Sequence, residues 1–222
     1  MSESLTRKSK LLRLREYINL ETGVIDEGAF LSSHVLYERA KEKKALDSAI
    51  RRCRKCPGLN MPWVTEAAPG WGSLTARIFF IGQSLHEPGV ETSIPFILGS
   101  GLLIDAALAL SSIGRHDIFW TNAVHCHPLK NRPSTDGERR NCLPYLREEL
   151  LLIEPDFIVA FGNDARASLE KALLHSSAKK FTPKTLFLKH PAALYRTGSP
   201  EARVAWILRL AKALDKYSGE QT

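Results

Sequence analysis

The chain of 222 residues lacks any apolar run near the roughly 20 residues that a membrane-spanning helix needs. Its N-terminal segment, MSESLTRKSKLLRLREYINL, also lacks the apolar core of a secretion signal. The spacing of Leu11, Leu12, Leu14 and Ile18 among basic residues predicts an amphipathic helix instead. The chain contains no internal repeat and no low-complexity segment, which excludes a repeat architecture. We therefore expect a globular protein of the cytoplasm that has no membrane partner.

Cysteine is scarce, with four residues in the whole chain. In a reducing compartment, four cysteines favour a metal site over disulfides. Cys53 and Cys56 form a C-x2-C pair, which places two thiolates on one turn, and Cys126 and Cys142 follow far downstream. Spacing alone leaves both zinc and a [4Fe–4S] cluster open, and four buried free cysteines are the third alternative.

Acidic residues are outnumbered, because 24 Asp and Glu face 31 Lys and Arg, for a net charge of +7. This excess favours a polyanionic partner such as nucleic acid, although many basic proteins have none. Residues 1–45 are polar and charged with helical patterning, and β-rich apolar runs begin after about Leu46. We expect a helical N-terminal extension over residues 1–45 and one folded domain over residues 46–222.

Short apolar runs alternate with helical stretches in the second part of the chain. The apolar runs are 77–82, 118–122, 156–162 and 185–190, and the helical stretches are 99–114, 137–154, 163–177 and a last helix from Ser199. Continuously apolar strands separated by helices predict a parallel sheet that is covered on both faces. The predicted fold is a three-layer α/β/α sandwich around a four-stranded parallel sheet. In such sheets the ligand site lies beyond the carboxyl ends of the strands.

Five segments, in this order, resemble the uracil-DNA glycosylase superfamily, and most closely its iron–sulfur branch, often called family four. They are CRKCPGL, FFIGQSLHEPGVETSIPFILGSGLLID, IFWTNAVHCHPLKNRPSTDGERRNCLPYL, FIVAFGNDA and KHPAALYR, and they span roughly residues 50–212. The resemblance implies a monomeric, monofunctional enzyme of base-excision repair, associated with the nucleoid if the cell is prokaryotic. It would hydrolyse the N-glycosidic bond of uracil in DNA, release free uracil and leave an abasic site. The resemblance also implies a structural [4Fe–4S] cluster on Cys53, Cys56, Cys126 and Cys142.

The resemblance assigns roles to three residues of a base-excision pocket. Phe96 would stack on the flipped base, and the Asn122 amide would pair with its O4/N3 edge. His190 would face the uracil O2, where a donor stabilises charge that develops in the transition state. Each has a plainer alternative: Phe96 as a core residue, Asn122 as a turn cap and His190 as an ordinary loop histidine.

The segment after His190 is expected to contact DNA. Its candidate residues are Pro191, Ala192, Leu194, Tyr195 and Arg196. Residues 191–194 would form a turn in the minor groove, Leu194 or Tyr195 would wedge into the space that the flipped base leaves, and Arg196 would contact a phosphate. Further basic residues near these loops are expected to contact phosphates or to be ordinary surface charges: Lys130, Arg132, Arg139, Arg140 and Lys189.

The first loop departs most from the family pattern. The family's G-E-A-P-G is replaced by Gly82, Gln83, Ser84, Leu85 and His86, so a carboxylate is missing. In a related branch with the motif G-Q-D-P-Y-H, the Asp that positions the attacking water stands where this chain has Ser84. A tyrosine that excludes the thymine methyl stands there at the position of His86. We expect Gln83 and Ser84 to hold water and backbone in place, with Gly82 at the base, while Glu87 and Glu91 could partly compensate. His86 could exclude a methyl group, act as a base or point to solvent.

The second strand ends in HCHP where the family usually has KCRP, so His125 and His127 have no assigned role. A related branch links covalently to its product through a histidine in an Arg-rich insertion. That insertion is absent here, and we expect turnover. Two alternatives to a uracil-DNA glycosylase stay open: a catalytically weakened DNA- or abasic-site-binding protein of the same fold, and a glycosylase for another deaminated base such as hypoxanthine.

Overall fold

The computed structural model describes residues 27–174 and 182–220, and the amphipathic helix expected around Leu11–Ile18 lies outside them. The chain divides into two compact units, Met1–Glu42 and Lys43–Thr222. Helix α2 (Glu27–Arg51) runs across this division, so that its last turns belong to the second unit. None of the helices in the described ranges combines the length and the apolar character that crossing a bilayer requires.

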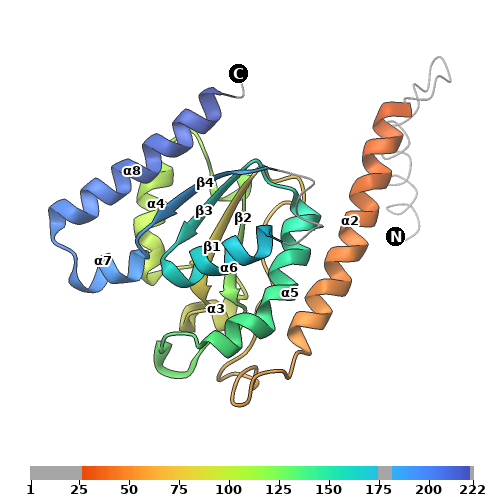
Figure 1. The fold of residues 1–222 in the computed structure, drawn as a ribbon. Helices are drawn as coiled ribbons and strands as arrows, with labels where there is room; N and C mark the ends of the chain where they lie inside the picture. The colour runs from red at the N-terminus through yellow and green to blue at the C-terminus, as the bar shows by residue number, and fades with distance from the viewer. Residues whose placement is uncertain (1–26, 175–181, 221–222) are drawn as a thin grey trace, which may run out of the picture. The chain divides into compact units, whose positions relative to one another are not determined.

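Four parallel strands form the sheet of the second unit, in the order β2-β1-β3-β4 (Figure 1). Their bounds are Ile78–Ser84 (β1), Ile118–Val124 (β2), Phe157–Phe161 (β3) and Lys184–Leu188 (β4). All three pairings of neighbouring strands are parallel, which confirms the predicted sheet. Strands β1 and β2 each run two residues past their predicted ends, and this extension carries them to the residues of the candidate site.

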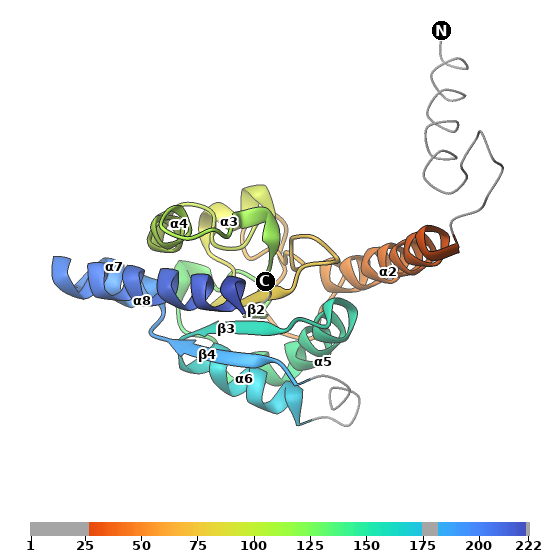
Figure 2. The ribbon, with the colours of Figure 1, turned by 90° about the horizontal axis from the view of Figure 1, so that it is seen from above.

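Helices cover both faces of the sheet, as the three-layer prediction requires (Figure 2). One face packs Phe80, Trp120 and Val159 against α4 (Leu102–Ala109) and α8 (Pro200–Gly219). The other face packs their strand neighbours, such as Phe79 and Ile158, against α5 (Asp136–Ile153) and α6 (Asn163–Leu173). Successive residues of a strand point to opposite faces, so continuously apolar strands supply both cores at once.

Two short helices were not predicted, α3 (Glu87–Thr92) and α7 (Pro191–Thr197). The expectation of a turn over residues 191–194 is wrong, because these residues begin α7. Pro191 suits the first helical position, where its missing N–H costs no hydrogen bond. The predicted helix over 99–114 is also shorter, with a 3-10 turn at Gly99–Gly101 followed by α4.

Candidate functional site

A pocket of about 480 Å³ opens at the carboxyl ends of β1 and β2. Its lining comes from the end of β1 and the loop after it, the segment before α4, the end of β2 and the segment after it, and α7 with its N-cap. The lining residues are Gln83, Ser84, Leu85, His86, Phe96, Gly99, Ser100, Asn122, Asn131, Pro133, His190, Ala192, Ala193, Tyr195 and Arg196. The fold therefore brings together six of the residues predicted for catalysis or base binding, from four separate segments.

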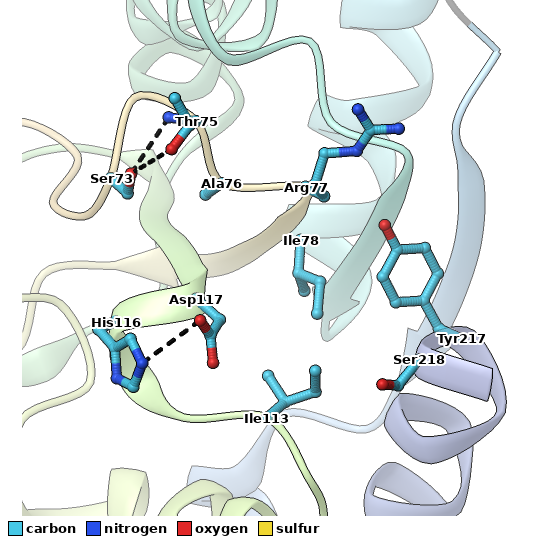
Figure 3. Close-up of a pocket in the computed structure, with 10 residues that line it drawn as sticks. All are labelled: Ser73, Thr75, Ala76, Arg77, Ile78, Ile113, His116, Asp117, Tyr217 and Ser218. Atoms are coloured by element: carbon cyan, nitrogen blue, oxygen red, sulfur yellow. Dashed lines mark hydrogen bonds and ion pairs between the residues drawn. The ribbon is translucent and has the colours of Figure 1, made fainter. Parts of the chain in front are cut away.

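A second pocket, of about 360 Å³, lies at the amino ends of β1 and β2 (Figure 3). Arg77 and Tyr217 line it, and the Arg77 guanidinium forms an ion pair with Asp156. None of the predicted site residues lines this pocket. The pocket at the carboxyl ends is thus the candidate site.

Gly82 leaves the space behind the pocket wall that two lining residues need. It lies opposite Asn122 in the β1–β2 register. A Cβ atom at Gly82 would overlap Asn122 Oδ1 and would lie 2.5 Å from Phe96 Cζ. Because only a bare backbone leaves this space, glycine lets the amide and the aromatic ring approach the same strand end. Gly82 therefore shapes the site from behind the lining.

Phe96 belongs both to the hydrophobic core and to the pocket wall. Its ring lies 5.4 Å from that of Phe161 and 6.1 Å from that of His190, between centroids. The Arg115 guanidinium steadies the preceding segment, because it donates to the Pro95 carbonyl oxygen at 3.3 Å and packs over Trp120. The structure thus places Phe96 in the core, as the plainer alternative expects, and its stacking on a base stays a prediction.

His190 caps α7 and lines the pocket. Its Nδ1 accepts a hydrogen bond from the Ala192 backbone N–H at 3.2 Å, so the hydrogen of the neutral ring resides on Nε2. Burial lowers the pKa of His190 to about 4, and the positive charge of Arg196 acts in the same direction. Near neutral pH the ring is uncharged and offers an N–H donor.

His86 lies in the pocket wall, half-buried, rather than pointing to solvent. Its Nε2 is 2.6 Å from the Ile97 carbonyl oxygen, which can only accept, so Nε2 carries the hydrogen and Nδ1 is left as an acceptor. Burial lowers the pKa of His86, which keeps this ring neutral as well. His86 therefore adds a neutral imidazole to the pocket lining, to which Gln83 and Ser84 also belong.

No carboxylate appears among the pocket-lining residues in the described part of the chain. Glu87 and Glu91 are exposed on α3 and do not line the pocket. His127 is buried, and its Nδ1 lies 3.1 Å from the Leu85 carbonyl oxygen. This contact fixes the segment that holds Gln83 and Ser84. Any water near Gln83 and Ser84 thus meets amide, hydroxyl and imidazole groups.

The predicted DNA-contacting residues divide by exposure. Leu194 is 6% exposed and packs in the core, whereas Tyr195 is 49% exposed at the pocket rim. Of the two predicted wedges, only Tyr195 offers its side chain to a partner in this structure. Pro191 is buried, Ala192 lines the pocket, and Arg196 is exposed.

Two of the predicted phosphate-contacting arginines are engaged within the protein. Arg132 donates twice to the Glu138 carboxylate, and Arg139 pairs with Asp136 and, at 2.9 Å, with Asp164. Arg132 therefore holds the loop after β2 against α5, and Arg139 joins α5 to α6. The remaining basic residues of the set are exposed: Lys130, Arg140, Lys189 and Arg196.

The four cysteines gather beside the end of β2. Cys126 and Cys142 are buried in one apolar cluster, which Cys56 joins, and none of the four forms a disulfide. Burial strongly raises the pKa of Cys126, and the charges of the other three cysteines raise it further, which places all four within electrostatic reach of one another. The Asn141 amide lies 3.4 Å from Cys56 Sγ as a donor. Within residues 27–174 and 182–220, no group of three or more His, Cys, Asp or Glu side chains is arranged to hold a single metal ion.

A buried ion pair that the sequence analysis did not identify adjoins the cysteines. His125 Nε2 lies 3.1 Å from Glu149 Oε1, and both side chains are almost completely buried. Burial alone would lower the pKa of His125, but the Glu149 carboxylate outweighs it and raises the pKa to about 10. The same pairing lowers the pKa of Glu149 against its own burial. One sequence signal was present: Glu149 falls on the apolar face of α5 that carries Leu146, Leu150 and Ile153.

Asn131 is a second residue that sequence reasoning left without a role. It is the last residue of the 3-10 turn Leu129–Asn131 after β2, has a φ of 53° and lines the pocket. Asparagine tolerates this left-handed conformation better than most residues, which explains its place at a tight bend. The signal was weak, because a lone Asn in a turn is common.

Comparisons with known proteins identify the family. A sequence profile of the Uracil DNA glycosylase superfamily matches residues 69–211. The chain is similar to the Type-4 uracil-DNA glycosylase of Thermotoga maritima, with 30% identity over 195 residues, 83% of this chain and all of that protein. It is also similar to the Type-4 enzyme of Pyrobaculum aerophilum (32% identity, 53% of this chain, 59% of that protein) and to the Type-5 uracil-DNA glycosylase of Thermus thermophilus (28%, 63% and 75%). With more than half of its length matched by the profile, and with the fold and the pocket described above, this chain belongs to the uracil DNA glycosylase superfamily.

Proposed function

We propose that this protein is a monofunctional uracil-DNA glycosylase, which hydrolyses the N-glycosidic bond of uracil in DNA and leaves an abasic site. The observation that carries the proposal is the pocket of about 480 Å³ in which Asn122, Phe96 and the neutral His190 surround one space. Its relatives named Type-4 uracil-DNA glycosylase support the same reading. The proposed setting is base-excision repair in the cytoplasm, at the nucleoid if the cell is prokaryotic, by a monomer that binds uracil-containing DNA.

Two pocket-lining residues, Phe96 and Asn122, recognise the base. A uracil that is flipped out of the duplex enters the pocket and stacks on the Phe96 ring. The Asn122 amide offers a donor and an acceptor at once, which matches the O4 and N3–H of uracil. Tyr195 and Arg196 are exposed residues of the pocket lining, and they contact the flanking DNA together with Ala192, whereas Pro191 is buried at the start of α7.

Bond cleavage places charge on both products. The electron pair of the C–N bond leaves with uracil, which becomes an anion, and the sugar becomes oxocarbenium-like. The His190 Nε2–H donates to O2 as this negative charge develops, so its stabilisation is greatest in the transition state. A neutral donor serves without the need to transfer its own proton.

Water then adds to the sugar from the side of Gln83 and Ser84. Since no carboxylate lines this part of the described pocket, we infer that bond breaking runs ahead of water attack. A cationic sugar needs little assistance from a base, and His86 Nδ1 is an acceptor that can orient the water. The proton that the water loses passes to solvent.

We further propose that Cys53, Cys56, Cys126 and Cys142 hold a structural [4Fe–4S] cluster. Four thiols within electrostatic reach of one another, with an amide donor on Cys56, suit this group. When bound, the cluster supplies cross-links between the segment after α2, the end of β2 and α5, and takes no part in bond cleavage. Purified protein should contain iron and sulfide, and zinc without iron would contradict the assignment.

The function is tested with single- and double-stranded oligonucleotides that carry uracil, hypoxanthine, thymine or an abasic site. Wild-type protein should release uracil and leave an alkali-labile abasic site. Asn122→Ala and His190→Ala should each lower the single-turnover rate by about 10²–10³-fold, the usual cost of losing one transition-state donor. Asn163→Ala and His116→Ala, at exposed positions outside the pocket, should leave the rate unchanged.

The same panel separates the alternatives. Tight binding to abasic DNA without release of any base would show a catalytically weakened binding protein. Release of hypoxanthine but not uracil would show a glycosylase for another deaminated base. Release of thymine by His86→Ala but not by wild-type protein would assign methyl exclusion to His86.

A further inference from the structure

We propose that Trp63 stacks on an unpaired base, so that the loop of residues 60–66 gives the protein a contact with single-stranded DNA outside the pocket. The inference extends the proposed function, from which it takes DNA as the partner. It starts from an exposed apolar patch that base excision in the pocket does not use. The patch consists of Met61, Pro62, Trp63 and Val64.

Trp63 is the most exposed large apolar side chain of the described residues, at 88%. Met61 and Val64 beside it are also exposed, whereas Trp120 and Trp206 are buried and each donates its indole N–H to a backbone carbonyl oxygen. Single exposed apolar residues are common on proteins, but a contiguous group around a tryptophan is typical of a binding surface. The patch therefore calls for a partner.

The backbone of the loop holds Trp63 in a defined and strained position. Its φ is 62°, in the left-handed region that bulky residues rarely adopt. The Trp63 backbone N–H donates to the Glu66 carboxylate at 3.4 Å, and the Thr65 N–H donates to the Met61 carbonyl oxygen at 3.0 Å. The buried side chain of Asn60 anchors the loop through three hydrogen bonds to the backbone. Strain that the surrounding bonds maintain is typical of functional positions, and a fixed loop loses little entropy on binding.

Contacts with the chain after β2 place the loop at the same end of the sheet as the pocket. The His127 backbone N–H donates to the Glu66 carbonyl oxygen at 3.2 Å. The ring of His127 in turn contacts the carbonyl oxygen of Leu85, which lines the pocket. Strand β2 is one edge of the sheet, and β4, which α7 follows, is the other. The loop thus lies on the β2 side of the pocket, whereas Tyr195 on α7 lies on the β4 side.

The charge beside the patch fits a polyanion. Residues 51–66 contain four basic side chains and one acidic side chain. The contacts of two of these cations are with neutral groups, because Lys55 lies over the Tyr145 ring and Arg54 donates to the Cys53 carbonyl oxygen. The four basic residues are all exposed: Arg51, Arg52, Arg54 and Lys55. An aromatic ring beside exposed cations is the pattern of single-stranded DNA binding, in which bases stack and the cations follow the phosphates.

Such a contact favours single-stranded over double-stranded DNA. In a duplex each base is already stacked between its neighbours, so a ring that approaches from outside meets no free base face. In a single strand the faces of the bases are accessible, and any base can stack on an aromatic side chain. Trp63 should therefore add affinity for single-stranded DNA and little affinity for duplex DNA.

The test compares the Kd for single-stranded and duplex oligonucleotides that contain no uracil, measured by fluorescence anisotropy of labelled DNA. Trp63→Asn introduces a side chain that tolerates the left-handed backbone. It should raise the Kd for the single strand at least fivefold, within the range of about 5- to 150-fold that the loss of one stacked base costs, and the Kd for the duplex less than twofold. Trp63→Phe keeps an aromatic face and should stay within about threefold of wild type for both. Leu174→Asn, the same kind of change at an exposed residue after α6, should alter neither value.

A second measurement needs no variant. Quenching of tryptophan fluorescence by acrylamide should fall when single-stranded DNA saturates wild-type protein, because the strand covers Trp63, and should change little with duplex DNA. Unchanged quenching, a rise below fivefold for Trp63→Asn, or an equal loss of duplex affinity would overturn the inference. A wild-type dimer that Trp63→Asn dissociates would also overturn it, since a second copy would then cover the patch.

Uracil release is assayed separately, so that the two proposals fail independently. Wild-type protein that releases uracil while Trp63→Asn binds single strands normally would overturn the inference alone. Wild-type protein that releases no uracil, but binds single strands through Trp63, would overturn the glycosylase and support the inference.

Discussion

Single histidines in this protein take opposite charge states because their neighbours differ. At His190 and His86 the loss of solvent outweighs the other influences, and the pKa of each is lowered. His125 is buried more deeply, yet its pKa is raised to about 10, because the Glu149 carboxylate outweighs the loss of solvent. Burial disfavours charge in every case, and only a specific counter-charge reverses it.

The low pKa of His190 predicts the pH dependence of base release. The folded-state pKa is about 4, below the ordinary value of 6.5, so the neutral donor persists as the pH falls from 8 to 6 and is lost only near pH 4. The single-turnover rate constant should therefore be flat above pH 6 and fall with a midpoint near 4. Measurements at constant ionic strength check this, with unfolding monitored in parallel. A midpoint near 6.5 that is absent in His190→Asn would contradict it.

The lowered pKa of His190 also makes the free energy of unfolding depend on pH. An unfolded chain binds a proton at His190 below about pH 6.5, whereas the folded chain does so only near pH 4. Between these values the unfolded state holds more protons, so His190 makes the fold less stable as the pH drops through that window. Parallel monitoring of unfolding is needed for this reason.

At the scale of helices and strands, the periodicity of apolar residues correctly predicted the strands and the start of the last helix. Four continuously apolar runs identified all four strands, and Pro200 after Ser199 marked the start of α8 correctly. The short α7 was missed, because seven residues beginning with His-Pro show too little periodicity to tell a helix from a turn. The gathering of Gln83, Asn122 and His190 followed from the rule on strand ends in parallel sheets.

Pairings between distant elements could not be predicted in this way. Glu149 on α5 meets His125 after β2 across 24 positions of sequence, and only the packed fold defines their contact. The burial of Leu194 is a similar case, since one rotation step along α7 separates it from the exposed Tyr195. Side-chain direction in a short helix depends on the neighbouring α4 and α8, which a local pattern does not contain.

The buried pair predicts unequal costs for single and double substitutions. Glu149→Leu should lower the free energy of unfolding by about 3–5 kcal/mol, because it leaves His125 without its counter-charge and frees the donors of Gly70 and Thr121. His125→Phe/Glu149→Leu should cost less than Glu149→Leu alone. Urea unfolding checks both, with Glu148→Leu on the exposed side of α5 as the control, expected within about 0.5 kcal/mol. Equal costs for the single and the double variant would show that the pair does not act as a unit.

At the scale of the whole molecule, the net positive charge comes from one part of the chain. Residues 1–42 carry seven basic and seven acidic residues, so the net charge of +7 belongs to residues 43–222. The second compact unit, Lys43–Thr222, also contains every residue of the candidate pocket and all four cysteines. The last turns of α2 fall in this unit, and Leu46 and Ile50 pack in the apolar cluster around Cys126 and Cys142.

Two truncations follow from this division. A chain of residues 43–222 should keep its iron, its thermal midpoint within a few degrees, and its rate of uracil release, because no pocket residue, cysteine or net charge is removed. Its affinity for DNA should also keep the same dependence on salt, because that slope counts the phosphates that Lys and Arg neutralise, and the residues proposed to contact phosphates all lie within 43–222. A chain of residues 53–222 lacks Leu46 and Ile50, which opens the apolar cover of the cysteines to water, and should lose iron and unfold at a lower temperature. Iron content, thermal unfolding and single-turnover release are measured on both. Loss of release by residues 43–222, with iron and folding intact, would show that the first 42 residues take part in catalysis or DNA binding.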